Sequence, residues 1–161
     1  MTVIKNGEIS SNIWIHLGDQ DTRAGHESFT VSLARWLAEK DSLAQSENPV
    51  GVRLVSTDDP SALAGDLAKL PLIVLEMNAF TDGRTFSQAR LLRDRMGYSG
   101  EIRVCGDFLR DQMFFLQRVG VDAFEFPESI DPADRLKAFQ EFSVTYQSSA
   151  DNPAPLYRRR S

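Results

Sequence analysis

The feature that most constrains the fold is a repeated alternation of short apolar runs with segments of helical periodicity. The runs are rich in β-branched and aromatic residues, as buried strands are, and they lie at residues 50–55, 72–75, 102–105 and 123–126. Each run precedes a segment whose apolar residues recur at the three- to four-residue spacing of an amphipathic helix. A strand, a crossover helix and the next strand make parallel neighbours. We therefore predict an α/β fold of repeated strand–helix units with a mostly parallel sheet.

The same pattern leaves two arrangements of the sheet open. A doubly wound open sheet is the first expectation, and a half-barrel of βα units, which a second copy of the chain could complete as a homodimer, is the alternative. We expect one α/β domain over residues 27–148, because 161 residues suffice to bury a core. Residues 1–26 are predicted to form an N-terminal arm with a short strand near Ile13, and residues 149–161 a proline-containing basic tail.

Local signals are less decisive in the first half of the chain. Residues 1–11 are polar and are expected to be loose. The apolar spacing over residues 27–40 favours a helix, although residues 29–31 could instead form a strand that leads into it. Asp58-Asp59-Pro60 predicts the start of a short helix that ends near Leu70, because aspartate caps helices and proline suits their first turn.

Charge and cysteine content exclude several functional classes. The net charge of -5 argues against general binding to nucleic acid or to an acidic membrane surface. Cys105 is the single cysteine, so this chain cannot form an internal disulfide or a thiolate metal cage, and we expect no metal site. No apolar run is long enough to span a membrane, and no signal-peptide pattern is present. We expect a soluble, cytoplasmic protein.

Three arginines are the candidate anion-binding residues: Arg84, Arg103 and Arg110. Arg84 follows the turn Asp82-Gly83 and Arg110 follows the turn at Gly106, while Arg103 lies inside a predicted strand. The carboxyl ends of parallel strands meet at one sheet edge, where α/β proteins bind ligands, and guanidinium forks suit oxyanions. The alternative is a purely structural network of salt bridges. The helix-face arginines nearby are expected to be solvated.

The chemical options at this edge are limited. Asp107 and Asp111 are the only weak candidates for a general acid or base, and Asp107 could equally cap the next helix, as Asp82 could for the preceding one. Neither a glycine-rich dinucleotide turn nor a phosphate loop occurs, so we expect no cofactor. Phe114 is predicted to lie on the polar side of its helix, exposed and available to a partner.

The motifs of the middle region resemble those of a known family. They are Phe-Thr-Asp-Gly-Arg at 80–84, Phe-Ser-Gln-Ala-Arg-Leu-Leu-Arg at 86–93, Gly-Glu-Ile-Arg at 100–103, Gly-Asp at 106–107, Arg-Asp-Gln at 110–112 and Gly-Val-Asp-Ala-Phe at 120–124. With this spacing the chain resembles the bacterial domain-of-unknown-function 934 family, whose members carry the label of an oxidoreductase of sulfite reduction. The resemblance implies a role in sulfur assimilation and cysteine biosynthesis, beside the sulfite reductase haemoprotein and phosphoadenylyl-sulfate reductase.

The residues themselves do not support the label of oxidoreductase. A lone thiol is the only group that could store electrons, and no cofactor motif accompanies it. We expect an accessory or regulatory protein of assimilatory sulfite reduction that binds a small oxyanion or the reductase. The alternative is a small enzyme that acts on a sulfur- or phosphate-containing anion, with Asp107 or Asp111 as acid or base.

Overall fold

The computed structural model describes residues 2–79, 81–106 and 108–143. One sheet contains eight strands in the order β2-β1-β8-β7-β6-β5-β4-β3. From β3 to β8 neighbouring strands are parallel, whereas β1 runs antiparallel to both β8 and β2. The predicted α/β fold with a mostly parallel sheet is therefore confirmed. The strands are β1 (Thr2–Lys5), β2 (Glu8–Ser11), β3 (Ile15–His16), β4 (Phe29–Ser32), β5 (Val50–Val55), β6 (Leu72–Met77), β7 (Glu101–Gly106) and β8 (Ala123–Phe126).

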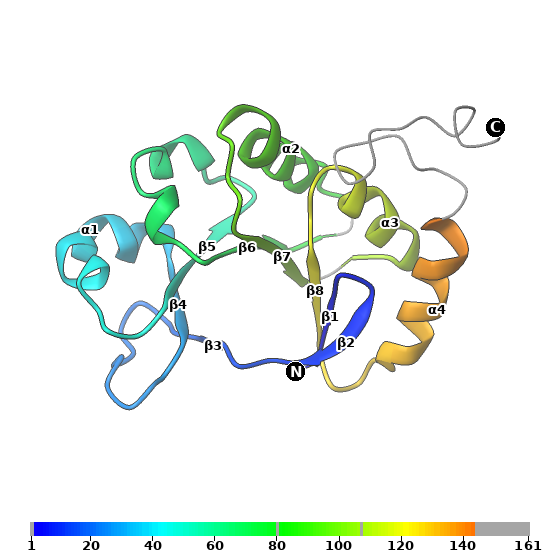
Figure 1. The fold of residues 1–161 in the computed structure, drawn as a ribbon, viewed down its shortest axis with the longest axis horizontal. Coiled ribbons are helices and arrows are strands. Elements are labelled where there is room, and N and C mark those ends of the chain that lie inside the picture. Colours follow the sequence, from blue (N-terminus) through cyan, green and yellow to red (C-terminus); the bar gives the residue numbers. More distant parts are fainter. Residues whose placement is uncertain (1, 80, 107, 144–161) are drawn as a thin grey trace.

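The sheet is a half-barrel, which is the second of the two predicted arrangements. Strands β3 to β8 follow one another in chain order without the reversal that a doubly wound sheet requires. Every crossover therefore winds in the same direction, and the helices lie on the outer side of the curled sheet (Figure 1). They are α1 (Leu33–Ala44), α2 (Arg84–Arg90), α3 (Arg110–Arg118) and α4 (Pro132–Ser143), with the short turns η1 (Pro60–Leu63), η2 (Leu67–Lys69) and η3 (Leu91–Arg95).

The main core lies between the outer face of the sheet and these helices. Alternate residues of the central strands, such as Ile73, Leu75, Ile102 and Val104, are fully buried there. Because side chains of a strand point to opposite faces in turn, the residues between them face the inside of the curl. The fold thus assigns every second position of β5 to β8 to an inner face.

Residues 2–11 differ from the prediction, because they form a hairpin rather than a loose end. Asn6 and Gly7 have positive φ values of 52° and 81°, which suit a tight turn between antiparallel strands. The hairpin joins the sheet through β1, which pairs with β8. From β2 the chain then crosses the open side of the curl and reaches β3 at the opposite edge (Figure 1). This crossing segment, residues 12–14, is called the arm below.

Two local predictions are resolved by the structure. Residues 29–32 form strand β4, and α1 begins only at Leu33, where the Ser32 side chain accepts the Arg35 N–H. The helix expected after Asp59-Pro60 does begin there, with the Asp59 side chain accepting the Ser61 N–H, but it forms two short 3₁₀ helices, η1 and η2, rather than one α-helix. Within the residues that the structure describes, no helix combines the length and apolar character needed to cross a bilayer.

Candidate functional site

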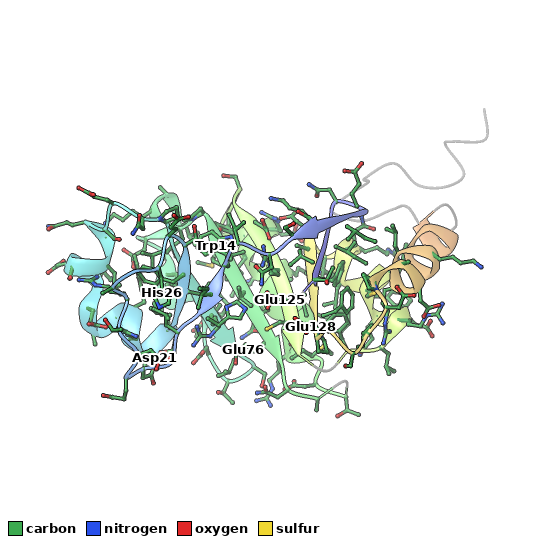
Figure 2. All side chains as sticks on the ribbon, turned by 90° about the horizontal axis from the view of Figure 1, so that it is seen from below. Trp14, Asp21, His26, Glu76, Glu125 and Glu128 are labelled. Carbon is green, nitrogen blue, oxygen red and sulfur yellow. The ribbon has the colours of Figure 1, made fainter. Side chains whose placement is uncertain are left out.

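The inner face of the sheet holds a chain of charged side chains. On β7, Ile102 and Val104 belong to the outer core, so Arg103 between them points inward. Glu125 on β8 and Glu76 on β6 also alternate with core residues and point inward. Figure 2 shows Glu76 and Glu125 on the central strands, with the segment that carries Trp14 crossing the same side of the sheet.

Arg103 is almost completely enclosed on this face, with 4% of its surface exposed. Its Nε lies 2.9 Å from Glu101 Oε1, and its Nη1 lies 3.2 Å from Glu125 Oε2. Nη1 also donates to Asn12 Oδ1 of the arm at 2.8 Å. Glu101 in turn holds Lys5, with 2.7 Å between Nζ and Oε2. Burying an arginine is costly unless its charge and N–H groups are paired, and here they are.

His16 of β3 contacts side chains of two other strands, Thr30 on β4 and Glu125 on β8. Its Nε2 lies 2.9 Å from Glu125 Oε1, and its Nδ1 lies 2.7 Å from the Thr30 hydroxyl. The Glu125 carboxylate accepts from Nε2, and the Thr30 hydroxyl is the hydrogen-bond partner of Nδ1. Both ring nitrogens are therefore engaged within the protein. The position of His16 in the sequence gave no indication of a partner 109 residues away.

Arg53 forms a second centre on β5. Its Nε donates to Glu76 Oε1 at 2.9 Å, and its Nη1 donates to the Thr30 hydroxyl at 2.8 Å. Its Nη2 donates to the Leu17 carbonyl at 2.7 Å. Arg53 thus fixes the segment that follows β3, in the same way that Arg103 fixes Asn12.

These groups form one paired system, which we call the inner-face network. Its members are Lys5, Asn12, His16, Thr30, Arg53, Glu76, Glu101, Arg103 and Glu125. Three basic side chains, Lys5, Arg53 and Arg103, balance three glutamates. Each lysine and arginine of the network is thus paired with a glutamate rather than available to an oxyanion, and the network ties the N-terminal segment across the open side of the sheet. Its chemistry is that of a buried structural network.

The pKa of Glu125 shows how strongly these partners act. Burial by itself raises the pKa of a carboxyl group. The hydrogen bonds and positive charges of His16 and Arg103 outweigh this effect and hold the pKa of Glu125 below its ordinary value. Glu125 is therefore ionised at neutral pH, although only 1% of its surface is exposed.

Cys105 lies between two of the glutamates of the inner face. Its register partners are Glu76 on β6 and Glu125 on β8. Burial, together with the two neighbouring carboxylates, raises the pKa of the thiol to about 12. The thiolate, which is the reactive form, is therefore strongly disfavoured at neutral pH.

The structure does not bring the three predicted anion-binding arginines together. Arg103 is buried on the inner face, whereas Arg84 and Arg110 are exposed at the starts of α2 and α3. Arg84 pairs with Asp82, with 3.0 Å between Nε and Oδ1, and Arg110 lies 3.7 Å from Asp134. Each arginine thus has a carboxylate of its own.

The predicted turn residues lie at the ends of strands: Asp82 and Gly83 stand between β6 and α2, and Gly106 is the last residue of β7. The Asp82 carboxylate accepts the Arg84 backbone N–H at 3.0 Å, after which Gly83 leads into α2. Hydrogen bonds from Arg84, with a further one from Ser56, lower the pKa of Asp82. Gly106 has a φ of 108°, and a Cβ at this position would overlap the Met77 carbonyl oxygen.

Only one of the two predicted acid–base candidates lies within the described residues. Asp107 lies outside the described residues. Asp111 is exposed in the first turn of α3. Across residues 2–79, 81–106 and 108–143, no three His, Cys, Asp or Glu side chains gather closely enough to hold a metal ion.

The prediction for Phe114 is wrong, because only 2% of its surface is exposed. Met113 and Leu116 of α3 belong to the core that the strands line, and the helix also packs against α4, so more than one of its sides is covered. Phe115, the next residue of the helix, is instead 47% exposed. The exposed aromatic residue of α3 is therefore shifted by one position from the prediction.

Phe115 lies in a surface groove between α2 and α3, which Figure 1 shows as neighbours on the outer side of the sheet. The groove has a volume of about 480 Å³. We call it the α2–α3 groove, and its lining residues are Phe86, Ser87, Arg90, Phe115, Arg118 and Val119. Three of them are apolar and two are arginines. It is the clearest combination of exposed aromatic surface and positive charge in the described part of the chain.

Comparison with known proteins identifies a family. The family model described as "Bacterial protein of unknown function (DUF934)" matches residues 51–157. No curated protein matches the chain significantly. The matched range contains the α2–α3 groove as well as Arg53, Arg103 and Glu125, whereas β1 to β4 precede it. Because the match spans well over half of the chain, the protein belongs to the DUF934 family of bacterial proteins.

Proposed function

We propose that the protein is an accessory or regulatory protein of assimilatory sulfite reduction that acts by binding a protein of that process. The observation that carries the proposal is the α2–α3 groove, where Phe115 is exposed next to two arginines. Partly exposed aromatic residues and arginines are the residue types most enriched at the centres of protein interfaces. The family resemblance supplies the process, with the sulfite reductase haemoprotein as first partner and phosphoadenylyl-sulfate reductase as second.

The alternative, a small enzyme that acts on a sulfur- or phosphate-containing anion, has less support from the described residues. A general base needs a nitrogen or oxygen that can reach the substrate. Both ring nitrogens of His16 are engaged, and the two inner-face arginines bind glutamates. The thiol of Cys105 is held protonated. Of the predicted anion-binding residues, Arg84 and Arg110 remain candidates at the surface, each beside a carboxylate.

Co-purification tests the proposal. The tagged full-length protein is isolated from bacteria growing on sulfate, and the eluate is examined for sirohaem absorbance and for sulfite-dependent consumption of electrons. We expect the haemoprotein to co-elute and its rate of sulfite reduction to change when the protein is added. A protein that elutes without either reductase, and that leaves both activities unchanged, would contradict the proposal.

A matched pair of variants locates the interaction. Phe115→Ala removes the exposed ring of the groove, and Leu37→Ala removes a side chain of similar exposure, 46%, from α1. Figure 1 shows α1 near the opposite end of the sheet from α3. We expect Phe115→Ala to lose the co-eluting reductase and Leu37→Ala to retain it. Loss in both variants would indicate an effect that is unrelated to the groove.

A further inference from the structure

We infer that the α2–α3 groove receives an acidic segment of the partner, with one apolar side chain of that segment packed against Phe115. This inference rests on the proposed function and names the chemistry of the partner. The observation behind it is that the groove has apolar lining residues and that its charged lining residues are all positive.

The apolar part of the groove is formed by both helices. Phe86 comes from α2, while Phe115 comes from α3 and Val119 ends it. Phe115 is held in place by an edge-to-face contact with the buried Phe114, at a ring separation of 5.4 Å. A rigid exposed ring loses little conformational entropy on binding, which favours its use as an anchor. An apolar side chain of the partner can therefore pack here without reorganising the groove.

The charged part of the groove is positive. Arg90 is exposed and makes no ion pair with any of the described residues. The Arg118 guanidinium lies over the Phe114 ring, 5.6 Å from its centroid, which orients the side chain along α3. None of the six described lining residues is an aspartate or a glutamate. Arginine forks bind carboxylates in two-point contacts, so a side-chain carboxylate of a partner fits beside Arg90.

The sign of this groove is opposite to that of the whole chain. The protein carries a net charge of -5, so the groove is a local positive region on an acidic molecule. Such a region selects acidic partners by complementarity and repels basic ones. The C-terminal sequence Arg158-Arg159-Arg160 has the same sign as the groove, so these residues of the chain are a poor match for it. An acidic segment of another protein is the occupant that the charges favour.

Fluorescence polarisation with labelled peptides tests this inference on the full-length protein. The first probe is a short peptide of glutamate, glycine and serine with one central phenylalanine. A second probe has lysine in place of glutamate, and a third has serine in place of the phenylalanine. We expect the first probe to bind most tightly, the third to bind more weakly and the lysine probe not to bind. The affinity of the first probe should fall as the salt concentration is raised, because exposed charge pairs are screened.

Variants show whether the groove is the binding site. We expect Phe115→Ala to raise the dissociation constant of the first probe about tenfold or more, as loss of an aromatic anchor does. Arg90→Glu should raise it as well, whereas Leu37→Ala and the exposed-charge control Arg95→Glu should leave it near the wild-type value. Equal binding of the lysine probe, an absence of binding at millimolar peptide, or no response to Phe115→Ala would each overturn the inference.

The outcome is separable from that of the proposed function. If the reductase co-elutes and Phe115→Ala releases it, but no acidic probe binds, then the protein is an accessory protein whose partner has different chemistry. If the acidic probe binds in the groove but neither reductase co-elutes, then the process named above is wrong and the binding chemistry stands.

Discussion

Phe114 and Phe115 are consecutive residues of α3 whose rings meet edge to face at 5.4 Å, yet 2% of Phe114 and 47% of Phe115 is exposed. One ring is part of the protein interior, and the next is part of the surface of the α2–α3 groove. We therefore expect Phe114 to stabilise the fold and Phe115 to bind the partner, although the two residues are adjacent. This separation can be measured.

Stability should respond to Phe114 far more than to Phe115. Phe114→Ala removes a buried ring and should lower the free energy of unfolding by about 3–5 kcal/mol. Phe115→Ala removes a half-exposed ring and should cost about 1 kcal/mol or less. Urea unfolding of the two variants, followed by circular dichroism, measures both values. A larger loss for Phe115→Ala would place the wrong ring in the interior.

The buried ion pairs of Arg103 should contribute to stability, whereas the exposed pair of Arg84 should not. Arg103→Met leaves Glu125, 1% exposed, without one of its positive partners, and such a change typically costs about 3–5 kcal/mol. Arg84→Met breaks a pair in which the arginine side chain is 61% exposed, so we expect no measurable change in unfolding. Similar unfolding midpoints for the two variants would show that the inner-face network is not a stabilising element.

Acid should weaken the protein through Glu125. Its pKa in the folded state lies below the ordinary value of 4.5, so the unfolded chain binds the proton more tightly. The stability from Glu125 is therefore complete above about pH 5 and is lost as the pH falls towards the folded pKa. We expect Glu125→Gln to be less stable than wild type at pH 7, but to lose less free energy of unfolding between pH 7 and pH 4. An identical loss in both proteins would exclude this role of Glu125.

Cys105 should react slowly in the folded protein. Its thiol, with a pKa of about 12, is almost entirely protonated at neutral pH, and only the thiolate attacks disulfide reagents. We expect the rate of reaction with Ellman's reagent at neutral pH to rise at least about tenfold when the protein is unfolded in urea. A rate in the native protein as high as in the unfolded one would reopen the case for a thiol in the function.

Sequence patterns predicted the strand–helix units because each central strand is a short, nearly continuous apolar run. Leu72, Ile73, Val74 and Leu75 are all fully buried, as a strand covered on both faces requires. The order of the strands in the sheet could not be predicted from these local patterns. Doubly wound sheets and half-barrels use the same local units and differ only in where each crossover returns.

The errors have identifiable physical causes. Residues 1–11 were expected to be loose because they are polar, although Asn6-Gly7 is a strong signal for a hairpin turn. The arginines of the helix face were expected to be solvated, but this is wrong for Arg93. Its guanidinium donates hydrogen bonds to the carbonyls of Tyr98, Gly100 and Gly120. Helical periodicity also misplaced Phe114, because it assumes one buried side, whereas α3 packs on both the sheet and α4.

The inner-face network was only partly predictable. Arg103 was predicted to lie inside a strand, where a buried arginine needs a carboxylate, and Glu101 does lie 2.9 Å away. Glu125 was missed, although a glutamate within the apolar strand Ala123–Phe126 is a similar signal of a buried partner. His16 lies on the edge strand β3, far from Glu125 in the sequence. The two residues meet only because the sheet is curled and the arm crosses its open side.

The most direct test of the account is the affinity of the purified sulfite reductase haemoprotein for the wild-type protein and for Phe115→Ala, measured by isothermal titration calorimetry. If Phe115 anchors the partner, its loss should raise the dissociation constant about 30-fold, the equivalent of about 2 kcal/mol for a central aromatic residue. Leu37→Ala, equally exposed on α1, should bind as the wild type does. Equal affinities for all three proteins, or no binding by the wild type, would contradict the proposal that this face recruits the reductase.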